Sequence, residues 1–382
     1  MMKSKELLFK LLRNEIFGKD LDLGDDNQYN AEMLFVISKA HDLAHIVNDA
    51  LVRNNIVPKD EEWAEKFKQE QMLAVYRETK ITSVTKIARE IFQKNQIKFI
   101  FLKGNVIRNF YPETWMRMSC DIDVLIHEDD LDRATKELLA AGFTTSGIKD
   151  YHDISFYYGQ LHFELHYNVL EDISNVDGLL DKIWDYTKVV DGCEYAETPE
   201  YFIFHHLAHM AYHLLMGGCG IKPFIDLYIL KTKNFYDEQK LMGLLKPHGL
   251  TRLYNGVLSL AKVWFEDCEY DEYTRSIEDF VLRGGVYGNH RNEHKIRTAR
   301  SKNKVGYIFH LIFLPYKNMC VFYQVLYKHK WLLPFCYIHR IFSRILGRKS
   351  RKARKNLKKI LTNDRTALES AERMLDYLGL EA

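Results

Sequence analysis

Two aspartates separated by one residue are the most informative chemical feature of this sequence. Asp121 and Asp123 flank Ile122 in a run, 121–126, whose apolar and β-branched residues predict a strand. Because alternate residues of a strand face the same side, the two carboxylates should project together. Each would raise the pKa of the other unless a cation lies between them. Oxygen ligands of this kind suit Mg²⁺ or Mn²⁺, so the pair predicts a divalent metal site.

A third acid, Glu164, lies in a later apolar run that is also predicted to be a strand. The runs 154–158 and 161–169 flank Gly159 and are predicted to pair as a hairpin. An acid in the middle of an apolar strand is costly to bury without a partner. If this strand lies beside the 121–126 strand, three carboxylates meet and can hold two metal ions for in-line phosphoryl transfer.

The neighbours of Glu164 leave alternatives open. Glu171 or Asp172, a few residues further along the chain, could serve as the third acid in its place. His162 and His166 share the strand face of Glu164. We consider His166 a candidate proton shuttle or orienting residue, the alternative being a pocket histidine with satisfied hydrogen bonds.

A glycine-bearing turn precedes the aspartates. Lys103, Gly104 and Asn105 follow the apolar run 97–102, which predicts a strand, and begin a helical turn. Gly104 permits close approach of the backbone, and free amides at the start of the turn can bind a phosphate. Lys103 and Arg117 are candidate phosphate cations. The alternatives are a solvated lysine at a strand end and an ion pair between Arg117 and the carboxylate cluster.

Three histidines recur at helical spacing later in the chain. His205, His209 and His213 lie at i, i+4 and i+8 of a helix predicted to begin at Pro199, with Thr198 as its cap. Such spacing can bind zinc. No glutamate stands in the position that a His-Glu-x-x-His motif requires, so packing or hydrogen bonding to a substrate pocket is favoured over a metal site.

Composition predicts a helix-rich α+β protein. The chain has 382 residues, 47% of them hydrophobic and 28% charged, which excludes a disordered or collagen-like chain. Only 7 prolines and 20 glycines argue against a turn-rich β-sandwich. We expect an N-terminal helical region over 1–95, an α/β core with a small mixed sheet over 96–195, a helical domain over 196–283, and a linker with an aromatic-basic helical tail over 284–382.

Cysteine usage and apolar runs bear on the compartment. The 6 cysteines form no Cys-x-x-Cys pair, which argues against a zinc ribbon and suits a reducing cytoplasm. The N-terminal residues lack the apolar core of a signal peptide, and no run approaches the length of a membrane span. We therefore expect a cytoplasmic protein, with peripheral attachment to the inner membrane face as an open question.

That question arises from the tail. Residues 331–346 are rich in aromatic and aliphatic side chains, and a dense basic run over 348–359 follows them. A solvated helix packed on the domain is the favoured interpretation. Attachment of 331–359 to an anionic membrane surface is the second, and contact with nucleic acid is less favoured because the whole chain has a net charge of only +2.

The motifs together resemble a known superfamily. A glycine turn after one strand, an Asp-x-Asp on the next and a lone acid on a later strand resemble the polymerase-beta-like nucleotidyltransferases. More narrowly, the chain resembles the family called uncharacterised nucleotidyltransferases. The residues that carry this resemblance are Leu102-Lys103-Gly104, Tyr111-Pro112, Arg117, Ser119 to Asp123, Glu164 to His166, His205 to His209, and Phe224 to Leu227.

The resemblance implies a nucleotidyltransferase fold and a set of roles. It implies a Mg²⁺-dependent or Mn²⁺-dependent transfer of a nucleoside monophosphate from an NTP to an acceptor, which could be a small molecule, a glycan or a protein. The implied catalytic metal ligands are Asp121, Asp123 and Glu164; the implied nucleotide-binding residues are Lys103, Gly104, Asn105, Arg117 and Ser119; candidate pocket residues are His166, His209 and Asp226.

Two further hypotheses remain beside this one. The superfamily usually has Gly-Gly or Gly-Ser at the turn, where this chain has Gly104-Asn105. A catalytically inactive scaffold or binding protein with the same fold, possibly peripheral to a membrane, is therefore an alternative. A transferase that adds a nucleotide to a partner protein is another.

Overall fold

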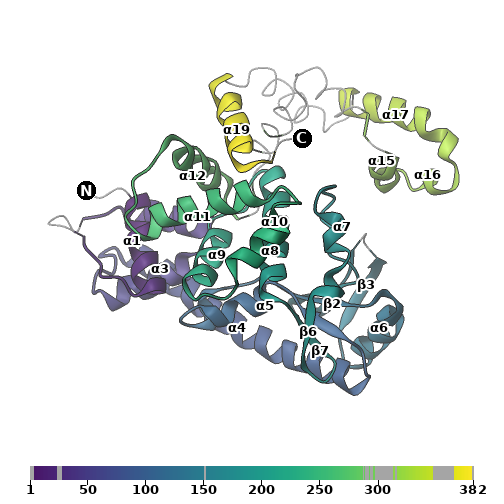
Figure 1. The fold of residues 1–382 in the computed structure, drawn as a ribbon, viewed down its shortest axis with the longest axis horizontal. Coiled ribbons are helices and arrows are strands. Elements are labelled where there is room, and N and C mark those ends of the chain that lie inside the picture. The colour runs from purple at the N-terminus through teal and green to yellow at the C-terminus, as the bar shows by residue number, and fades with distance from the viewer. Residues whose placement is uncertain are drawn as a thin grey trace.

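The computed structural model describes residues 4–23, 28–149, 152–286, 316–346 and 365–380, together with 288, 292, 296, 313 and 314 (Figure 1). Helices precede, interrupt and follow a single sheet. The helices before the last sheet strand are α1 (Ser4–Phe17), α2 (Ala31–Ala40), α3 (Ala44–Arg53), α4 (Glu61–Lys94), α5 (Gly104–Ile107), α6 (Leu131–Ala140) and α7 (Asp177–Leu180). Those after it are α8 (Pro199–Leu215), α9 (Lys222–Thr232), α10 (Glu238–Leu245), α11 (Thr251–Phe265), α12 (Glu272–Gly284), α15 (Tyr316–Phe322), α16 (Val325–Lys328), α17 (Leu333–Leu346) and α19 (Arg365–Leu378).

The sheet mixes parallel and antiparallel neighbours. Within the described residues it has seven strands in the order β3-β4-β5-β2-β1-β7-β6. Its strands are β1 (Phe99–Phe101), β2 (Asp121–Ile126), β3 (Thr144–Lys149), β4 (Asp153–Tyr158), β5 (Leu161–His166), β6 (Thr187–Asp191) and β7 (Glu194–Glu197). Strand β2 runs antiparallel to β1 and parallel to β5, so the two strands that carry the predicted acids are direct neighbours.

Alternation of residue types sets the two faces of the central strands. Ile122 and Val124 of β2, with Phe163 and Leu165 of β5, are fully buried on one face, where they pack with residues of α4 and α6. The intervening positions of β2 and β5 are polar and only partly buried over most of their length. The apolar face therefore fixes which way the acids point, because a shift of one residue would bury them instead.

A larger core lies on the other side of the sheet. It joins residues of α1 and α3 to residues of α8, α9 and α11, and it includes Leu125 from β2 and Ile100 from β1. Helices from both ends of the sequence therefore pack in one cluster over the sheet. Helix α4 spans 34 residues and is tied to β7 by the Arg89–Glu194 ion pair, in which Nε lies 2.6 Å from Oε2.

The predicted fold class is confirmed: the protein is α+β, with a mixed sheet and helical regions on both sides. The predicted hairpin is confirmed as β4 and β5, and a helix does begin at Pro199. Thr198 is the N-cap residue, as predicted, and its side chain makes no capping hydrogen bond. Strands β3, β6 and β7 were not predicted. The domain boundaries stay a prediction.

Two predicted segments fall largely or wholly beyond the described residues. The predicted linker that begins at residue 284 is described at only a few positions as far as residue 303, and the basic run over 348–359 lies outside the described residues. Across the described helices, none is both long enough and apolar enough to cross a membrane.

Candidate active site

The register of β2 against β5 brings the predicted acids together. Asp123 is the direct neighbour of Glu164, and Asp121 is the neighbour of His162. In a parallel pair such neighbours project from the same face of the sheet. The polar face of these two strands therefore carries three carboxylates and two imidazoles, since His166 follows Glu164 by two residues.

Ligand atoms of these side chains form two overlapping groups. Asp121, His162 and Glu164 make one, and Asp123, Glu164 and His166 make the other; in each, the atoms lie within 4.8 Å of one another. Glu164 belongs to both groups. Its Oε1 lies 3.4 Å from Nδ1 of His162, and its Oε2 lies 3.3 Å from Nε2 of His166. The arrangement has the atom types and spacing that a divalent cation needs.

The two aspartates have very different pKa values, because the neighbouring charges act on them differently. Burial, followed by the charges of Asp123 and Glu164, raises the pKa of Asp121 to about 6. Burial would also raise the pKa of Asp123, but a hydrogen bond from His166 and the charge of Lys103 outweigh it and hold this pKa at about 2. One aspartate is thus firmly ionised while the other is poised to take up a proton.

His166 is the positive partner within the cluster. Burial lowers its pKa, but hydrogen bonds to Asp123 and Glu164 outweigh burial and raise the pKa to about 9. Its Nε2 lies 3.4 Å from Oδ1 of Asp123. At neutral pH the imidazolium therefore neutralises part of the carboxylate charge.

The glycine turn is fastened to the strand that carries the aspartates. The amide of Leu102 donates to the carbonyl of Asp123 at 3.0 Å, and Lys103 then adopts a φ of 21°, which L-residues rarely use. A Cβ on Gly104 would lie 2.8 Å from Oγ of Ser119, so glycine allows the turn to approach the residues that precede β2. Within the described structure the amides of Lys103 and Gly104 donate to no protein acceptor, which leaves both available to an anion.

Lys103 connects this turn to helix α8. Its Nζ lies 3.6 Å from Oε1 of Glu171, and the same oxygen lies 2.6 Å from Nδ1 of His209. Burial, and next the charge of Lys103, lower the pKa of His209 to about 4; burial and the charge of His209 lower the pKa of His213 to about 3. Nε2 of His213 lies 3.0 Å from Nε2 of His209, so Glu171, His209 and His213 form one hydrogen-bonded chain.

A cavity of about 270 Å³ adjoins this chain of histidines. Glu171 contributes to its wall, as do Tyr212 on α8 and Met216, the residue that directly follows this helix. The remaining wall combines loop residues after β5 with apolar residues from α8, α11 and the end of α19: Asp172, Ile173, Ser174, Asn175, Ala211, Leu215, Leu250, Gly379 and Leu380. Glu171 therefore contacts both this cavity and Lys103, which is not part of the cavity wall.

Arg117 forms a buried ion pair with the aspartate of helix α9. Its Nε lies 2.7 Å from Oδ1 of Asp226 and its Nη2 lies 2.8 Å from Oδ2, which is a bidentate geometry. The hydroxyl of Tyr111 donates to the same Oδ1 at 2.7 Å, and Asp226 is completely buried. Burial lowers the pKa of Arg117, but the Asp226 carboxylate outweighs it and raises the pKa above its usual range.

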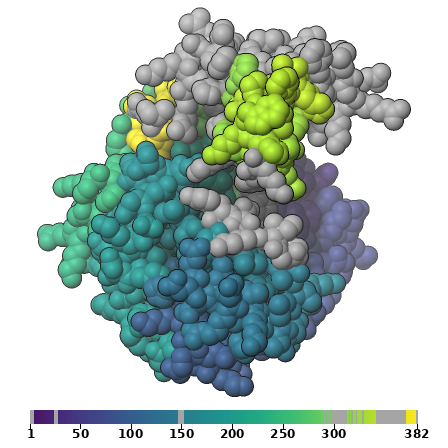
Figure 2. All heavy atoms as spheres, turned by 90° about the vertical axis from the view of Figure 1, so that its right-hand side faces the viewer, coloured from purple at the N-terminus to yellow at the C-terminus, as the bar shows by residue number. Residues whose placement is uncertain are grey.

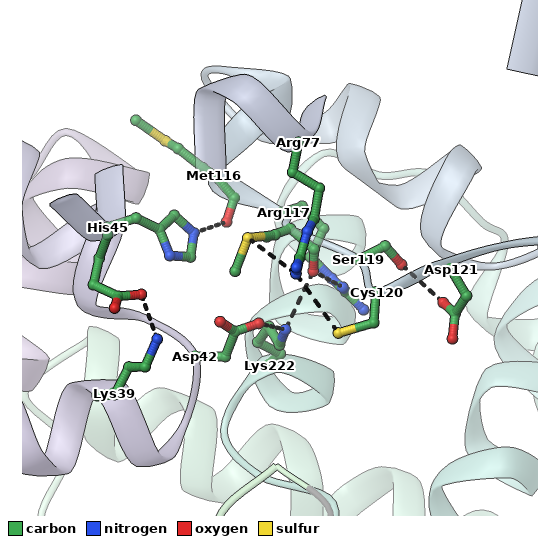
Figure 3. Close-up of polar contacts among 12 residues, drawn as sticks. Lys39, Asp42, His45, Arg77, Met116, Arg117, Ser119, Cys120, Asp121 and Lys222 are labelled. Carbon is green, nitrogen blue, oxygen red and sulfur yellow. Dashed lines mark hydrogen bonds and ion pairs between the residues drawn. The ribbon is translucent and has the colours of Figure 1, made fainter. Parts of the chain in front are cut away.

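The segment that leads into β2 is held by residues from two distant parts of the chain (Figure 3). Nε2 of His45, on α3, donates to the carbonyl of Met116 at 2.9 Å. Nζ of Lys222, on α9, donates to the carbonyl of Met118 at 3.2 Å and pairs with Asp42 at 2.6 Å. Because these contacts hold backbone carbonyls, they set the path of the chain up to Asp121.

The structure brings some predicted residues together and separates others. Asp121, Asp123, Glu164 and His166 lie in one cluster, with Ser119 Oγ 3.4 Å from Oδ1 of Asp121. The other predicted residues are arranged around it: Lys103, Gly104 and Asn105 in the turn, His209 beyond Glu171, and Arg117 with Asp226 in the buried ion pair. Their roles in nucleotide binding stay predictions.

The residues considered as an alternative third acid or as zinc ligands have other partners or are exposed. Glu171 bonds to His209 and Lys103 and is in neither carboxylate group, while Asp172 is exposed. His205 hydrogen-bonds to Glu197, and among the described residues no metal-holding group includes a histidine of α8.

Sequence reasoning missed several contacts. His162 was noted only as a neighbour of Glu164, although its position on the same strand face pointed to it as a ligand. The braces from His45 and from the Asp42–Lys222 pair were not predicted, because nothing in the sequence links positions so far apart.

Fold and site define a class of protein: a mixed-sheet α+β protein with a carboxylate-histidine cluster suited to a divalent cation, beside a strand-to-helix turn with free amides. Within that class, the model of the family described as uncharacterised nucleotidyltransferase matches residues 27–266, and the chain belongs to this family. The resemblance drawn from the motifs is thereby confirmed. No curated protein and no solved structure matches the chain.

The buried Arg117–Asp226 pair predicts a large loss of stability on removal of one partner. Asp226→Ala leaves the guanidinium uncompensated and should lower the free energy of unfolding by about 3–5 kcal/mol. The double variant Arg117→Met with Asp226→Leu should lose clearly less, because it buries no lone charge. Denaturant unfolding measures both. Asp279→Ala, which breaks the exposed Arg283–Asp279 pair, is the control and should cost at most about 1 kcal/mol. Equal losses in the single and double variants would contradict the assignment.

His45 predicts a pH-dependent term in stability. Burial lowers the pKa of His45 from its ordinary value of 6.5 to about 4, so between these pH values the unfolded chain binds a proton that the folded chain does not. This contribution is present above pH 6.5 and is lost as the pH falls toward 4. In His45→Gln, which can still donate to Met116, unfolding free energies at pH 7 and pH 4.5 should differ by about 2–3 kcal/mol less than in the parent. An unchanged pH dependence would be inconsistent with a neutral buried His45.

Proposed function

We propose that this protein transfers a nucleoside monophosphate from an NTP to an acceptor and releases pyrophosphate, with Mg²⁺ or Mn²⁺ at the carboxylate cluster. The observation that supports the proposal is the convergence of Asp121, Asp123 and Glu164, which lie 43 or fewer positions apart in sequence, into overlapping groups of ligand atoms. Family membership supports nucleotidyl transfer as the general chemistry.

The residues present fit a divalent cation. Three carboxylates in contact carry an excess of negative charge, which a cation would relieve, and the raised pKa of Asp121 is a sign of that excess. The oxygen donors suit Mg²⁺, and the adjacent imidazoles of His162 and His166 are compatible with Mn²⁺. Asp121, Asp123 and Glu164 would hold the metal, and His166 would then give up its proton or turn aside.

Each part of the site has a task in this proposal. A bound divalent cation would polarise the attacking oxygen and offset charge on the leaving pyrophosphate. The amides of Lys103 and Gly104 bind the β- and γ-phosphates, with the Lys103 ammonium beside them. Ser119 and Asn105 complete this wall. Arg117 acts through Asp226 and positions the segment that leads into β2.

The acceptor side is proposed from the histidine chain. Because the Glu171 carboxylate only accepts hydrogen bonds, His209 carries its proton on Nδ1 and accepts on Nε2. His213 then donates from Nε2, which leaves its Nδ1 as an acceptor. Within the described structure this Nδ1 has no protein partner, so it can take a hydrogen bond from an acceptor hydroxyl.

The lining of the neighbouring cavity indicates the charge of that acceptor. Among the described residues, Glu171 and Asp172 line it and no lysine or arginine does. A phosphorylated acceptor or a nucleic acid end would meet repulsion there. An uncharged or amine-bearing alcohol is the class that the wall favours.

Asp121→Asn should separate activity from stability. Loss of a metal ligand should lower nucleotidyl transfer by more than about 100-fold. Without metal, the same change should raise the free energy of unfolding at pH 7 by about 1–2 kcal/mol, because an ionised Asp121 whose pKa is raised to about 6 opposes folding above that pH. Transfer is measured with NTPs labelled at the α-phosphate, offered with Mg²⁺ and a panel of alcohols.

A matched control is available on α6. Asp132→Asn removes the same charge from an exposed position in the first turn of that helix. It should leave activity unchanged and should lower the free energy of unfolding by at most about 1 kcal/mol. Full transfer by Asp121→Asn would refute the metal-ligand role. A loss of stability in that variant would show that Asp121 is a structural acid.

The inactive scaffold remains the second candidate, and His166 is the observation that favours it. Its imidazolium already neutralises the cluster in part, so the fold can persist without a metal. Calorimetry with ATP, GTP, CTP and UTP, with and without Mg²⁺, separates the two. Binding that requires Mg²⁺ supports the transferase, and absence of metal-dependent binding to all four supports the scaffold.

A further inference from the structure

Charge is distributed very unevenly along this chain. Residues 294–363 contain 18 lysines and arginines and no aspartate or glutamate. This stretch therefore carries +18, and because the whole chain carries only +2, the remaining residues carry −16. A near-neutral total thus conceals a strongly basic segment attached to an acidic body.

Part of the basic stretch forms a small helical unit. Helices α15, α16 and α17 pack around buried Met319, Cys320, Leu326 and Cys336, which form a cluster separate from the two cores of the body. Figure 2 shows this unit, in yellow-green, gathered at one end of the molecule. Its position leaves one of its faces open to solvent.

Large apolar side chains stand on the outside of this unit. Trp331 is 69% exposed, Phe335 62% and Ile338 52%. Phe335 and Ile338 lie three residues apart on one side of α17, and Trp331 lies in the short turn, Lys330–Leu332, that leads into this helix. Phe322 is 61% exposed and Val325 44%. Single exposed apolar residues are ordinary, but five on a unit of this size mark an interaction surface.

Cations accompany the apolar residues. Lys330 is exposed, and its ammonium lies 5.6 Å from the ring centre of Tyr316. Arg340 is buried beneath this surface, and its guanidinium lies 5.0 Å from the ring centre of Phe322. The sequence over 294–363, which includes this unit, contains no aspartate or glutamate. An exposed aromatic-aliphatic face with cations and no acids is complementary to the headgroups and upper acyl chains of an anionic bilayer.

We infer that the α15–α17 unit docks the protein on an anionic lipid surface, with Trp331, Phe335 and Ile338 entering the interface. Nucleic acid offers the same negative charge but does not account for the aliphatic members. Bases stack on aromatic rings, whereas Ile338 and Val325 gain nothing from stacking and gain free energy in a hydrocarbon interface.

Flotation of the full chain with vesicles tests this inference without reference to any activity. Vesicles of phosphatidylcholine mixed with phosphatidylserine should carry the protein, and vesicles of phosphatidylcholine alone should not. Trp331→Ser with Phe335→Ser should weaken binding by about tenfold or more, because both side chains lose their burial in the interface. Raising the salt from about 0.1 M to about 1 M should also weaken it.

A matched variant tests whether replacing any exposed apolar pair by serine weakens vesicle binding. Met72 and Leu73 on α4 are also exposed, at 61% and 58%, so Met72→Ser with Leu73→Ser should leave vesicle binding unchanged. A blue shift of tryptophan fluorescence on anionic vesicles, lost in Trp331→Phe, would place that indole in the interface. The inference is overturned if neither kind of vesicle carries the protein. It is also overturned if the variant at Trp331 and Phe335 binds anionic vesicles as well as the variant at Met72 and Leu73 does. It is also overturned if the chain binds single-stranded RNA instead, or if the variant at Trp331 and Phe335 converts a dimer to a monomer.

Discussion

The whole site depends on one pairing, the parallel register of β2 and β5 that sets Asp123 beside Glu164. That register is fixed from the opposite face, where Ile122, Val124 and Phe163 are fully buried. The hydrophobic effect acting on one side of the sheet therefore forces like charges together on the other. The acids therefore repel one another. This repulsion contributes to the raised pKa of Asp121, whereas nearby positive groups keep the pKa of Asp123 low.

The surroundings limit that repulsion without abolishing it. His166 and Lys103 are both close enough to lower the pKa of Asp123, yet Asp121 is left with a raised one. The approach to Asp121 is held by helices from distant parts of the chain, through the Arg117–Asp226 pair and the contact of His45 with Met116. Rigid support of this kind keeps a repulsive cluster from relaxing apart, which is what a preorganised cation site requires.

Strand alternation was enough to predict that Asp121 and Asp123 share a face and that Glu164 lies on a second strand. Their convergence could not be derived from the sequence, because the order of strands in a sheet depends on packing between distant segments. The pairing of Arg117 with Asp226 was not predicted for the same reason, because Asp226 lies on a helix 109 positions away. Strand β6 was missed because Val189 and Val190 are exposed there, so its burial pattern does not alternate.

Electrostatics links the two ends of the molecule. A body with a charge of −16 repels nucleoside triphosphates as well as anionic lipids, so both kinds of ligand depend on local positive charge to approach it. At the sheet that charge comes from Lys103, from free amides and, in the proposed function, from a divalent cation. In the sequence, a second source of positive charge is the range 294–363, which contains no aspartate or glutamate. Because screening at about 0.1 M salt confines each field to about 10 Å, each ligand is attracted by the charges at its own binding site rather than by the charge of the whole chain.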